Sequence, residues 1–319
     1  MTQTPISFEG VFPILVTPFD EEENLDLASF ARLIGAMADM GVDGVTILGV
    51  LGEADRLDDG ERDQLIATAI ESAAGRIPVI VGTSHSGTAA TCALSRRAES
   101  LGASGVMVTP TREPTPNAEK IFQYFQKVAD SISIPIVAQD HPASTQVHMP
   151  IELLLRLVEE IPAVACLKAE AMPSPPRVTA LLDGMGSRRV PILSGLGALY
   201  GIFDLERGSH GFMTGFAFPE VLIPLTAAAK SGRWDEAWRI YRRFLPLIVF
   251  EQQPGLGVRK ELYRLRGFIR CNRVRHPGAT IDGETAQALR NVVDRVLPGE
   301  DITRPVAGDG KLAEAGFGG

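Results

Sequence analysis

The sequence predicts a (β/α)8 barrel followed by a helical C-terminal extension. Short β-branched runs alternate with single amphipathic stretches, a pattern typical of parallel strands joined by crossover helices. A glycine-flanked segment also recurs, because residues 40–47 (MGVDGVTI) are echoed at 101–108 and more weakly at 207–214. This recurrence favours a cyclic βα fold. An open doubly wound sheet would usually carry a glycine-rich dinucleotide loop after its first strand, where this chain has Val16-Thr17-Pro18-Phe19.

The predicted strands are short apolar runs bounded by glycine, proline or polar residues. In chain order they are Val11–Val16, Gly44–Leu48, Pro78–Val81, Gly105–Thr109, Pro135–Gln139, Val164–Lys168, Val190–Ser194 and Gly211–Thr214. The stretches between them carry apolar residues at helical spacing, and those predicted as helices include Leu25–Met40, Gly60–Ala74, Thr88–Leu101, Ala118–Ser131 and Ile151–Glu160. The order of these runs supports parallel pairing around a barrel.

After Gly215 the pattern changes to helices with no further strand signal. The predicted helices are Pro219–Ser231, Trp234–Phe250, Gly257–Arg266 and Thr285–Val296. In the third of these, Arg259, Lys260 and Arg264 are expected to form a solvated face. We therefore predict a barrel over residues 1–218, a helical extension over 219–302 and a flexible tail over 303–319, which is rich in glycine and alanine.

Composition narrows the class of partner. The net charge of −8 argues against nucleic acid or an anionic membrane, since both require basic patches. No apolar stretch is long enough to span a membrane. The 3 cysteines lack CxxC spacing, and the first ten residues lack the features of a secretory signal. We expect a cytoplasmic protein that acts on a small molecule, with no metal site because the histidines show no paired ligand spacing.

Lys168 differs from the other lysines, which lie in polar or basic helices or in the tail. It closes the apolar run Ala163–Leu167 at the carboxyl end of the sixth predicted strand, and this end of the strands holds the active site in (β/α)8 barrels. Burial lowers the pKa of an ammonium group and frees the neutral amine to attack a carbonyl. The sequence predicts that Lys168 forms a Schiff base with the carbonyl group of a substrate. The alternative is a lysine whose head reaches solvent.

Residues at other strand ends are expected on the same rim. Glu170 projects to the side of Lys168 if the strand continues, so we expect it to move protons with help from Gln139, Asp140 or His141. Equally, Glu170 could only pair with an arginine. Backbone N–H groups of the glycine-rich turn at residues 49–52 are expected to hold a carboxylate. The expected substrate-binding residues are Val50, Leu51, Gly52, Asp140, His141, Ser194, Gly195 and Thr214.

From about Phe8 to Pro298 the chain resembles the dihydrodipicolinate synthase / N-acetylneuraminate lyase family of class I aldolases. The likeness rests on residues 10–19 (GVFPILVTPF), the GxxGE loop ending at Glu53, residues 79–83 (VIVGT), the strand with Lys168, and Ser194-Gly195. The resemblance implies a barrel, a Schiff base at Lys168 with a 2-oxo acid such as pyruvate, no cofactor beyond that lysine, and a homo-oligomer, either a dimer or a tetramer.

The chain departs from the pattern of this family at several positions. Val50 and Leu51 replace the hydroxyl residues of the usual GTTGE loop. Gln139 stands where the family carries a proton-transferring tyrosine. The arginine that binds the second substrate of true dihydrodipicolinate synthases would fall at Ser144, and the tyrosine that crosses a subunit interface would fall near Thr111 or Arg112. The usual acid/base triad is therefore missing.

Three functions remain open from the sequence. The chain looks similar to the branch that dehydrates 2-keto-3-deoxy sugar acids such as 2-keto-3-deoxyarabonate, through the Gln139-Asp140 ending and the stretch from Glu251 to Arg275-His276-Pro277. That likeness predicts a Schiff-base hydro-lyase or aldolase. The alternatives are a 4-hydroxy-tetrahydrodipicolinate synthase with an altered proton relay and a non-catalytic barrel that binds a 2-oxo acid.

Overall fold

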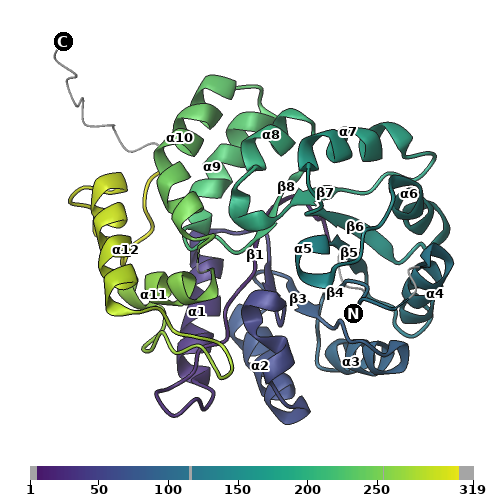
Figure 1. Ribbon diagram of the computed structural model, residues 1–319, viewed down its shortest axis with the longest axis horizontal. Coiled ribbons are helices and arrows are strands. Elements are labelled where there is room, and N and C mark those ends of the chain that lie inside the picture. Colours follow the sequence, from purple (N-terminus) through teal and green to yellow (C-terminus); the bar gives the residue numbers. More distant parts are fainter. Residues whose placement is uncertain (1–5, 115–116, 254, 309–319) are drawn as a thin grey trace.

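The computed structural model (Figure 1) describes residues 6–114, 117–253 and 255–308. Eight strands form one sheet: β1 (Gly10–Pro13), β2 (Val45–Ile47), β3 (Val79–Gly82), β4 (Gly105–Val108), β5 (Ile136–Asp140), β6 (Val164–Ala169), β7 (Ile192–Ser194) and β8 (Gly211–Thr214). The helices between them are α1 (Leu27–Met40), α2 (Asp59–Ala73), α3 (Thr88–Ser100), α4 (Ala118–Ala129), α5 (Pro142–Thr145), α6 (Ile151–Glu160), α7 (Ser174–Gly184) and α8 (Gly201–Glu206).

The strands are all parallel and run in the order β1-β8-β7-β6-β5-β4-β3-β2. Between β1 and β2 the sheet closes through a parallel bridge from Ile14 to Thr46, where the Leu15 N–H donates to the Thr46 carbonyl at 2.9 Å. The first strand ladder therefore stops at Pro13 rather than at the predicted Val16. The predicted (β/α)8 barrel is confirmed.

The C-terminal part is helical, as predicted. It comprises α9 (Pro219–Lys230), α10 (Trp234–Phe250), α11 (Leu256–Leu265) and α12 (Gly283–Val296). Helix α9 follows β8 and contacts both β1 and α10, while α12 packs against α10 and α11 at one side of the barrel (Figure 1). The buried Val306 donates its N–H to Glu220 of α9, whereas residues 309–319 of the predicted tail lie outside the described part.

The repeated glycines occupy the conformations that their recurrence predicts. Gly41, Gly102 and Gly208 follow α1, α3 and α8 with φ of 77°, 99° and 95°, in the left-handed region that lacks a penalty only for glycine. A second glycine of each copy, Gly44, Gly105 or Gly211, then begins or precedes a strand. The three copies are equivalent helix-to-strand turns of the barrel.

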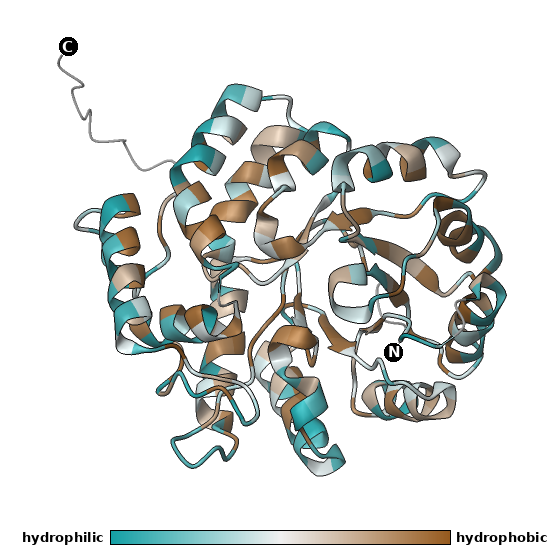
Figure 2. Cartoon of the chain, viewed as in Figure 1, coloured by the Kyte–Doolittle hydropathy of each residue, from teal (hydrophilic) through white to brown (hydrophobic). Residues whose placement is uncertain are grey.

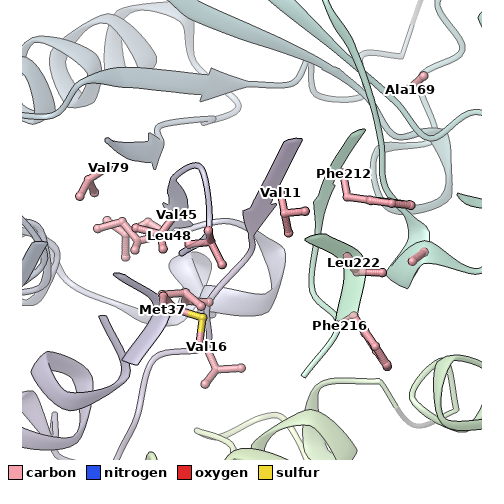
Figure 3. Close-up of a cluster of buried hydrophobic side chains, with 14 of the residues drawn as sticks. Val11, Val16, Met37, Val45, Leu48, Val79, Ala169, Phe212, Phe216 and Leu222 are labelled. Atoms are coloured by element: carbon pink, nitrogen blue, oxygen red, sulfur yellow. The ribbon is translucent and has the colours of Figure 1, made fainter. Parts of the chain in front are cut away.

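Apolar residues form two separate layers. Seven alternate strand residues pack inside the barrel, namely Phe12, Ile80, Met107, Val137, Cys166, Leu193 and Met213. The intervening strand residues pack outward against the helices, and Figure 3 shows Val11, Val45 and Phe212 of strands with Met37 of α1 and Leu222 of α9 in this layer. Apolar colour follows the strands, while the outer helix surfaces are mostly hydrophilic (Figure 2). No helix in the described residues could cross a membrane.

Candidate active site

Two-residue alternation decides which strand-end side chains enter the barrel. Val137 and Cys166 lie in the inner layer, so Gln139 and Lys168 two residues later project inward from neighbouring strands. The two residues are paired in register on β5 and β6. Lys168 is 4% exposed, and its amine is therefore held inside the barrel mouth.

Lys168, Glu170 and Gln139 form one hydrogen-bonded group. Lys168 Nζ lies 2.9 Å from Glu170 Oε2, and Gln139 Nε2 donates to the same oxygen at 2.7 Å. The other carboxylate oxygen, Oε1, accepts the Leu196 N–H at 3.1 Å. Glu170 thus projects to the side of Lys168, as the alternation predicts, and its partner is this lysine rather than an arginine.

The electrostatics of this group keep Glu170 ionised. Burial raises the pKa of the Glu170 carboxyl, but the charges of Lys168 and His141 and the hydrogen bonds from Gln139 and Lys168 outweigh it, so the pKa lies below its ordinary value. Burial lowers the pKa of His141, opposed by the charge of Glu170. The site therefore places a carboxylate base and a neutral imidazole beside the amine at pH 7.

Most predicted site residues line one small cavity. The cavity has a volume of about 140 Å³ and is lined by Val50, Leu51, Gln139, His141, Lys168, Glu170 and Thr214 from the predicted set. Thr214 Oγ1 is buried and has no hydrogen-bond partner among the residues that the structure describes. A second hollow of about 740 Å³ shares Val50, Met107 and Gln139 with the first and also includes Ser84 and Thr109. The two hollows therefore border each other at these shared residues.

Two predicted substrate-binding residues face away from this cavity. Asp140 follows the inward Gln139, so its carboxylate points outward and accepts a hydrogen bond from Arg177 of α7 at 2.7 Å. Ser194 follows the inward Leu193, and its hydroxyl donates to Ser209 at 3.2 Å. Neither residue lines the cavity. The two-residue alternation that predicts inward side chains for Lys168 and Glu170 also predicts that Asp140 and Ser194 point away from the cavity.

The loop after β2 places Val50 and Leu51 at the cavity, but one of its backbone donors is already used. The Gly52 N–H donates to the Gly49 carbonyl at 2.9 Å, and the Gly52 carbonyl accepts the Thr17 hydroxyl at 2.6 Å. Of the backbone N–H groups of residues 49–52 that are expected to hold a carboxylate, the Gly52 N–H is therefore already used to close the turn.

Buried charges hold this loop against α11. Glu53 is 1% exposed and forms ion pairs with Lys260 and, at 2.7 Å, with Arg56; it also accepts the Arg275 N–H at 2.9 Å. The expectation of a solvated face is wrong for Arg259 and Lys260, which are 4% and 0% exposed, because α11 packs into the protein. It holds only for Arg264, whose side chain is 39% exposed.

Two residues of the C-terminal helices that the sequence did not reveal as site residues also line the cavity: Arg259 of α11 and Gln252, just after α10. A buried carboxylate, Glu251, accepts a hydrogen bond from Arg259 Nε at 2.8 Å. Within the described residues no group of three or more histidines, cysteines or carboxylates is placed to bind a metal ion.

Gly195 does not line the cavity, yet it determines where Glu170 lies. A Cβ atom added at Gly195 would stand 2.1 Å from Glu170 Oε1, so only glycine admits the carboxylate at this place. A Gly195→Ala variant should displace Glu170 and lower turnover about 100-fold, while the Schiff base expected at Lys168 should still form. Steady-state kinetics and borohydride trapping measure the two effects, and unchanged turnover would contradict this placement of Glu170.

The fold and the site together define a (β/α)8 enzyme of the aldolase-type lyases, with a buried lysine and an ionised carboxylate at the carboxyl ends of its strands. The chain belongs to the dihydrodipicolinate synthetase family, whose model matches residues 7–296. The resemblance seen in the sequence is therefore confirmed over almost the whole barrel and helical extension.

Individual relatives divide between two activities. The chain is 38% identical over 295 residues to an L-2-keto-3-deoxyarabonate dehydratase of Azospirillum brasilense, covering 91% of this chain and 94% of that protein. It is 32% identical over 290 residues to a 4-hydroxy-tetrahydrodipicolinate synthase of Persephonella marina, covering 90% and 97%.

Solved structures show the same fold. Dihydrodipicolinate synthase from Rhodopseudomonas palustris superposes with a TM-score of 0.86 at 34% identity, covering 92% of this chain and 99% of that one. YagE from E. coli K12, solved in complex with pyruvate, superposes with a TM-score of 0.83 at 25% identity, covering 91% and 98%.

Proposed function

We propose that this protein is a Schiff-base hydro-lyase that removes water from a 2-keto-3-deoxy sugar acid, with Lys168 as the nucleophile. The observation that carries the proposal is the buried pair of Lys168 and Glu170, 2.9 Å apart, in a cavity that none of the 4 tyrosines lines. The likeness to the Azospirillum dehydratase supports the substrate class.

The proposed reaction begins at the lysine. The neutral amine of Lys168 attacks the C2 carbonyl, and the carbinolamine hydroxyl, protonated from solvent, leaves as water to give an iminium ion. This electron sink acidifies C3, so the Glu170 carboxylate removes a C3 proton to give an enamine. The C4–O bond then breaks, and the hydroxyl leaves as water with the proton held by Glu170. Hydrolysis of the unsaturated iminium frees Lys168, for a net loss of one water.

Gln139 and His141 support this proton transfer in the proposal. Gln139 Nε2 fixes the Glu170 carboxylate but has no acidic proton to exchange, so Glu170 replaces the tyrosine of the family as the mobile acid/base. His141 lines the same cavity, and its Nδ1 lies 2.7 Å from the Ser144 hydroxyl. A neutral imidazole so placed can donate a hydrogen bond to the departing hydroxyl.

The second candidate is 4-hydroxy-tetrahydrodipicolinate synthase, which the Persephonella relative favours. Ser144 stands where the resemblance puts the arginine for the second substrate, which weighs against this activity. The proposal also includes a covalent lysine adduct in place of a bound cofactor, a homo-oligomer of two or four copies, and action in the cytoplasm.

Borohydride reduction with pyruvate or 2-keto-3-deoxyarabonate, followed by peptide mass mapping, tests the Schiff base. We expect the mass increase on the peptide that contains Lys168, and an adduct on any other peptide would overturn the assignment. Turnover of 2-keto-3-deoxyarabonate without activity on pyruvate plus aspartate semialdehyde supports the dehydratase. The reverse pattern would establish the synthase.

A Glu170→Gln variant should separate adduct formation from elimination. The amide keeps the shape of the side chain but cannot accept the C3 proton, so we expect turnover to fall about 10²- to 10⁴-fold while pyruvate still forms a reducible adduct at Lys168. Rapid-quench measurement of the two steps would show this. Loss of both steps in proportion would mean that Glu170 only positions the lysine.

A further inference from the structure

Arg259 is a buried cation with unused hydrogen-bonding capacity. Its guanidinium carries five N–H donors, and Nε donates to Glu251. In the part of the chain that the structure describes, Nη1 and Nη2 make no hydrogen bond, although the residue is only 4% exposed. The free edge of this planar cation can therefore donate to an acceptor from outside the protein. Arg259 lines the Lys168 cavity, where such an acceptor can bind.

Glu251 neutralises Arg259 incompletely. Burial raises the pKa of the Glu251 carboxyl to about 7, against the lowering effect of the Arg259 charge. The carboxyl is therefore only partly ionised at neutral pH, and it also accepts the Ala217 N–H at 3.1 Å. Glu251 fixes the orientation of the guanidinium while part of its positive charge remains available to an anion in the cavity.

Arg259 lies close to the loop after β2, because both it and Leu51 of that loop lie next to Gly215. A Cβ atom added at Gly215 would stand 2.0 Å from Leu51 Cδ1 and 3.2 Å from Arg259 Nη1. The leucine side chain and the guanidinium therefore share the space next to Gly215. Leu51 has no polar group, and the Gly52 N–H is used inside its own turn. In this chain the side chains of Val50 and Leu51 thus offer a carboxylate no donor beyond the backbone N–H groups of the loop, and an arginine stands beside them.

The small cavity and the larger hollow beside it suggest how a ligand is oriented at Lys168. The small cavity is lined by Arg259, Thr214 and Lys168, and it meets the larger hollow at Gln139 and Val50. A 2-oxo acid whose C2 bonds to Lys168 can direct its carboxylate towards Arg259 and its hydroxylated tail towards the hollow. The unpartnered Thr214 hydroxyl adds one more donor within the small cavity.

We propose that Arg259, held by Glu251, binds the carboxylate of the 2-oxo acid and replaces the hydroxyl groups that the loop at Val50 and Leu51 lacks. This proposal rests on the Schiff base at Lys168. A planar guanidinium matches a carboxylate with two parallel hydrogen bonds, so Arg259 selects 2-oxo acids over neutral ketones.

The test compares trapping of pyruvate with trapping of pyruvamide, its uncharged analogue. In Arg259→Gln, the pyruvate concentration for half-maximal borohydride trapping should rise about 30-fold or more, whereas the value for pyruvamide should change less than about 3-fold. Arg259→Lys keeps the charge without the planar fork and should lie between, about 5- to 10-fold weaker for pyruvate. Arg259→Lys retains a cation beside Glu251. It therefore still allows trapping to be measured if Arg259→Gln does not fold.

Arg264→Gln is the matched control, since Arg264 lies on the same helix but its side chain is exposed, does not line the cavity and is paired with Glu261. It should trap both probes like the unmodified protein. If the trapping of pyruvate and of pyruvamide weakened equally in Arg259→Gln, Arg259 would be a structural residue and the proposal would be wrong. Unchanged trapping of pyruvate would also overturn the proposal. Absence of any Lys168 adduct in the unmodified protein would instead refute the Schiff base itself.

Discussion

A Lys168→Met variant should lose borohydride trapping completely and lower turnover by at least about 10⁴-fold, because Lys168 is the nucleophile of the proposed reaction. Methionine keeps the apolar stem of the side chain, so the packing around β6 is preserved. Glu170 retains its hydrogen bonds from Gln139 and the Leu196 N–H and faces a cavity. We therefore expect the free energy of unfolding to fall by only about 1–2 kcal/mol.

The measurements are peptide mass mapping after reduction, steady-state kinetics and denaturant unfolding of the same preparations. A residual adduct on another lysine would move the chemistry elsewhere. A loss of about 3–5 kcal/mol, as is typical when one partner of a buried ion pair is removed, would show that Lys168 is a structural lysine. Loss of trapping with an intact fold would also exclude the alternative in which the amine of Lys168 reaches solvent, since a solvated amine contributes little to a reaction inside the barrel.

Much of the fold follows from short-range patterns. Alternating apolar runs identify the strands, and the recurrent glycines mark turns that require a positive φ, as at Gly41 and Gly102. Two-residue alternation also places Glu170 beside Lys168. Applied to the whole rim, the same rule would have turned Asp140 and Ser194 outward, because each follows an inward-facing residue.

Long-range packing determines the rest of the candidate site. In the sequence, Arg259 and Lys260 look like part of a solvated basic helix, and no local pattern distinguishes them from Arg264. Their burial arises because α11 packs beside the loop that follows β2, more than 200 residues earlier in the chain. A charged residue near the C-terminus can thus line the cavity without any signal in its neighbourhood.

Replacement of Glu53 by glutamine should cause the largest loss of stability among the changes considered. Glu53 is the ion-pair partner of Lys260, whose ammonium is fully buried 4.5 Å from the centre of the Phe19 ring. Without the carboxylate this cation is left uncompensated, which typically costs about 3–5 kcal/mol. The polar amide preserves shape, so the loss reports charge rather than packing.

The loss should also depend on pH in a defined direction. Burial lowers the pKa of Lys260 to about 8, while the charge of Glu53 opposes that shift, so the variant must have a lower value still. The unfolded chain holds the same proton to about pH 10.4. Folded Lys260 therefore releases its proton at lower pH in the variant than in the unmodified protein. The variant regains stability as the pH rises towards 8. Above that pH, Lys260 is neutral in both folded proteins. The difference in unfolding free energy should be largest near pH 6 and clearly smaller at pH 9.

Glu261→Gln provides the comparison that isolates this effect. Glu261 is also buried on α11, at 2% exposure, but its partners Arg264 and Arg290 are 39% and 40% exposed and can be hydrated when the carboxylate is removed. Its replacement should cost about 1 kcal/mol or less, with little difference between pH 6 and pH 9. If Glu53→Gln were equally mild, or equally costly at both pH values, the buried charges would not be what holds the loop after β2 in place. The geometry at Val50 and Leu51 would then need another explanation.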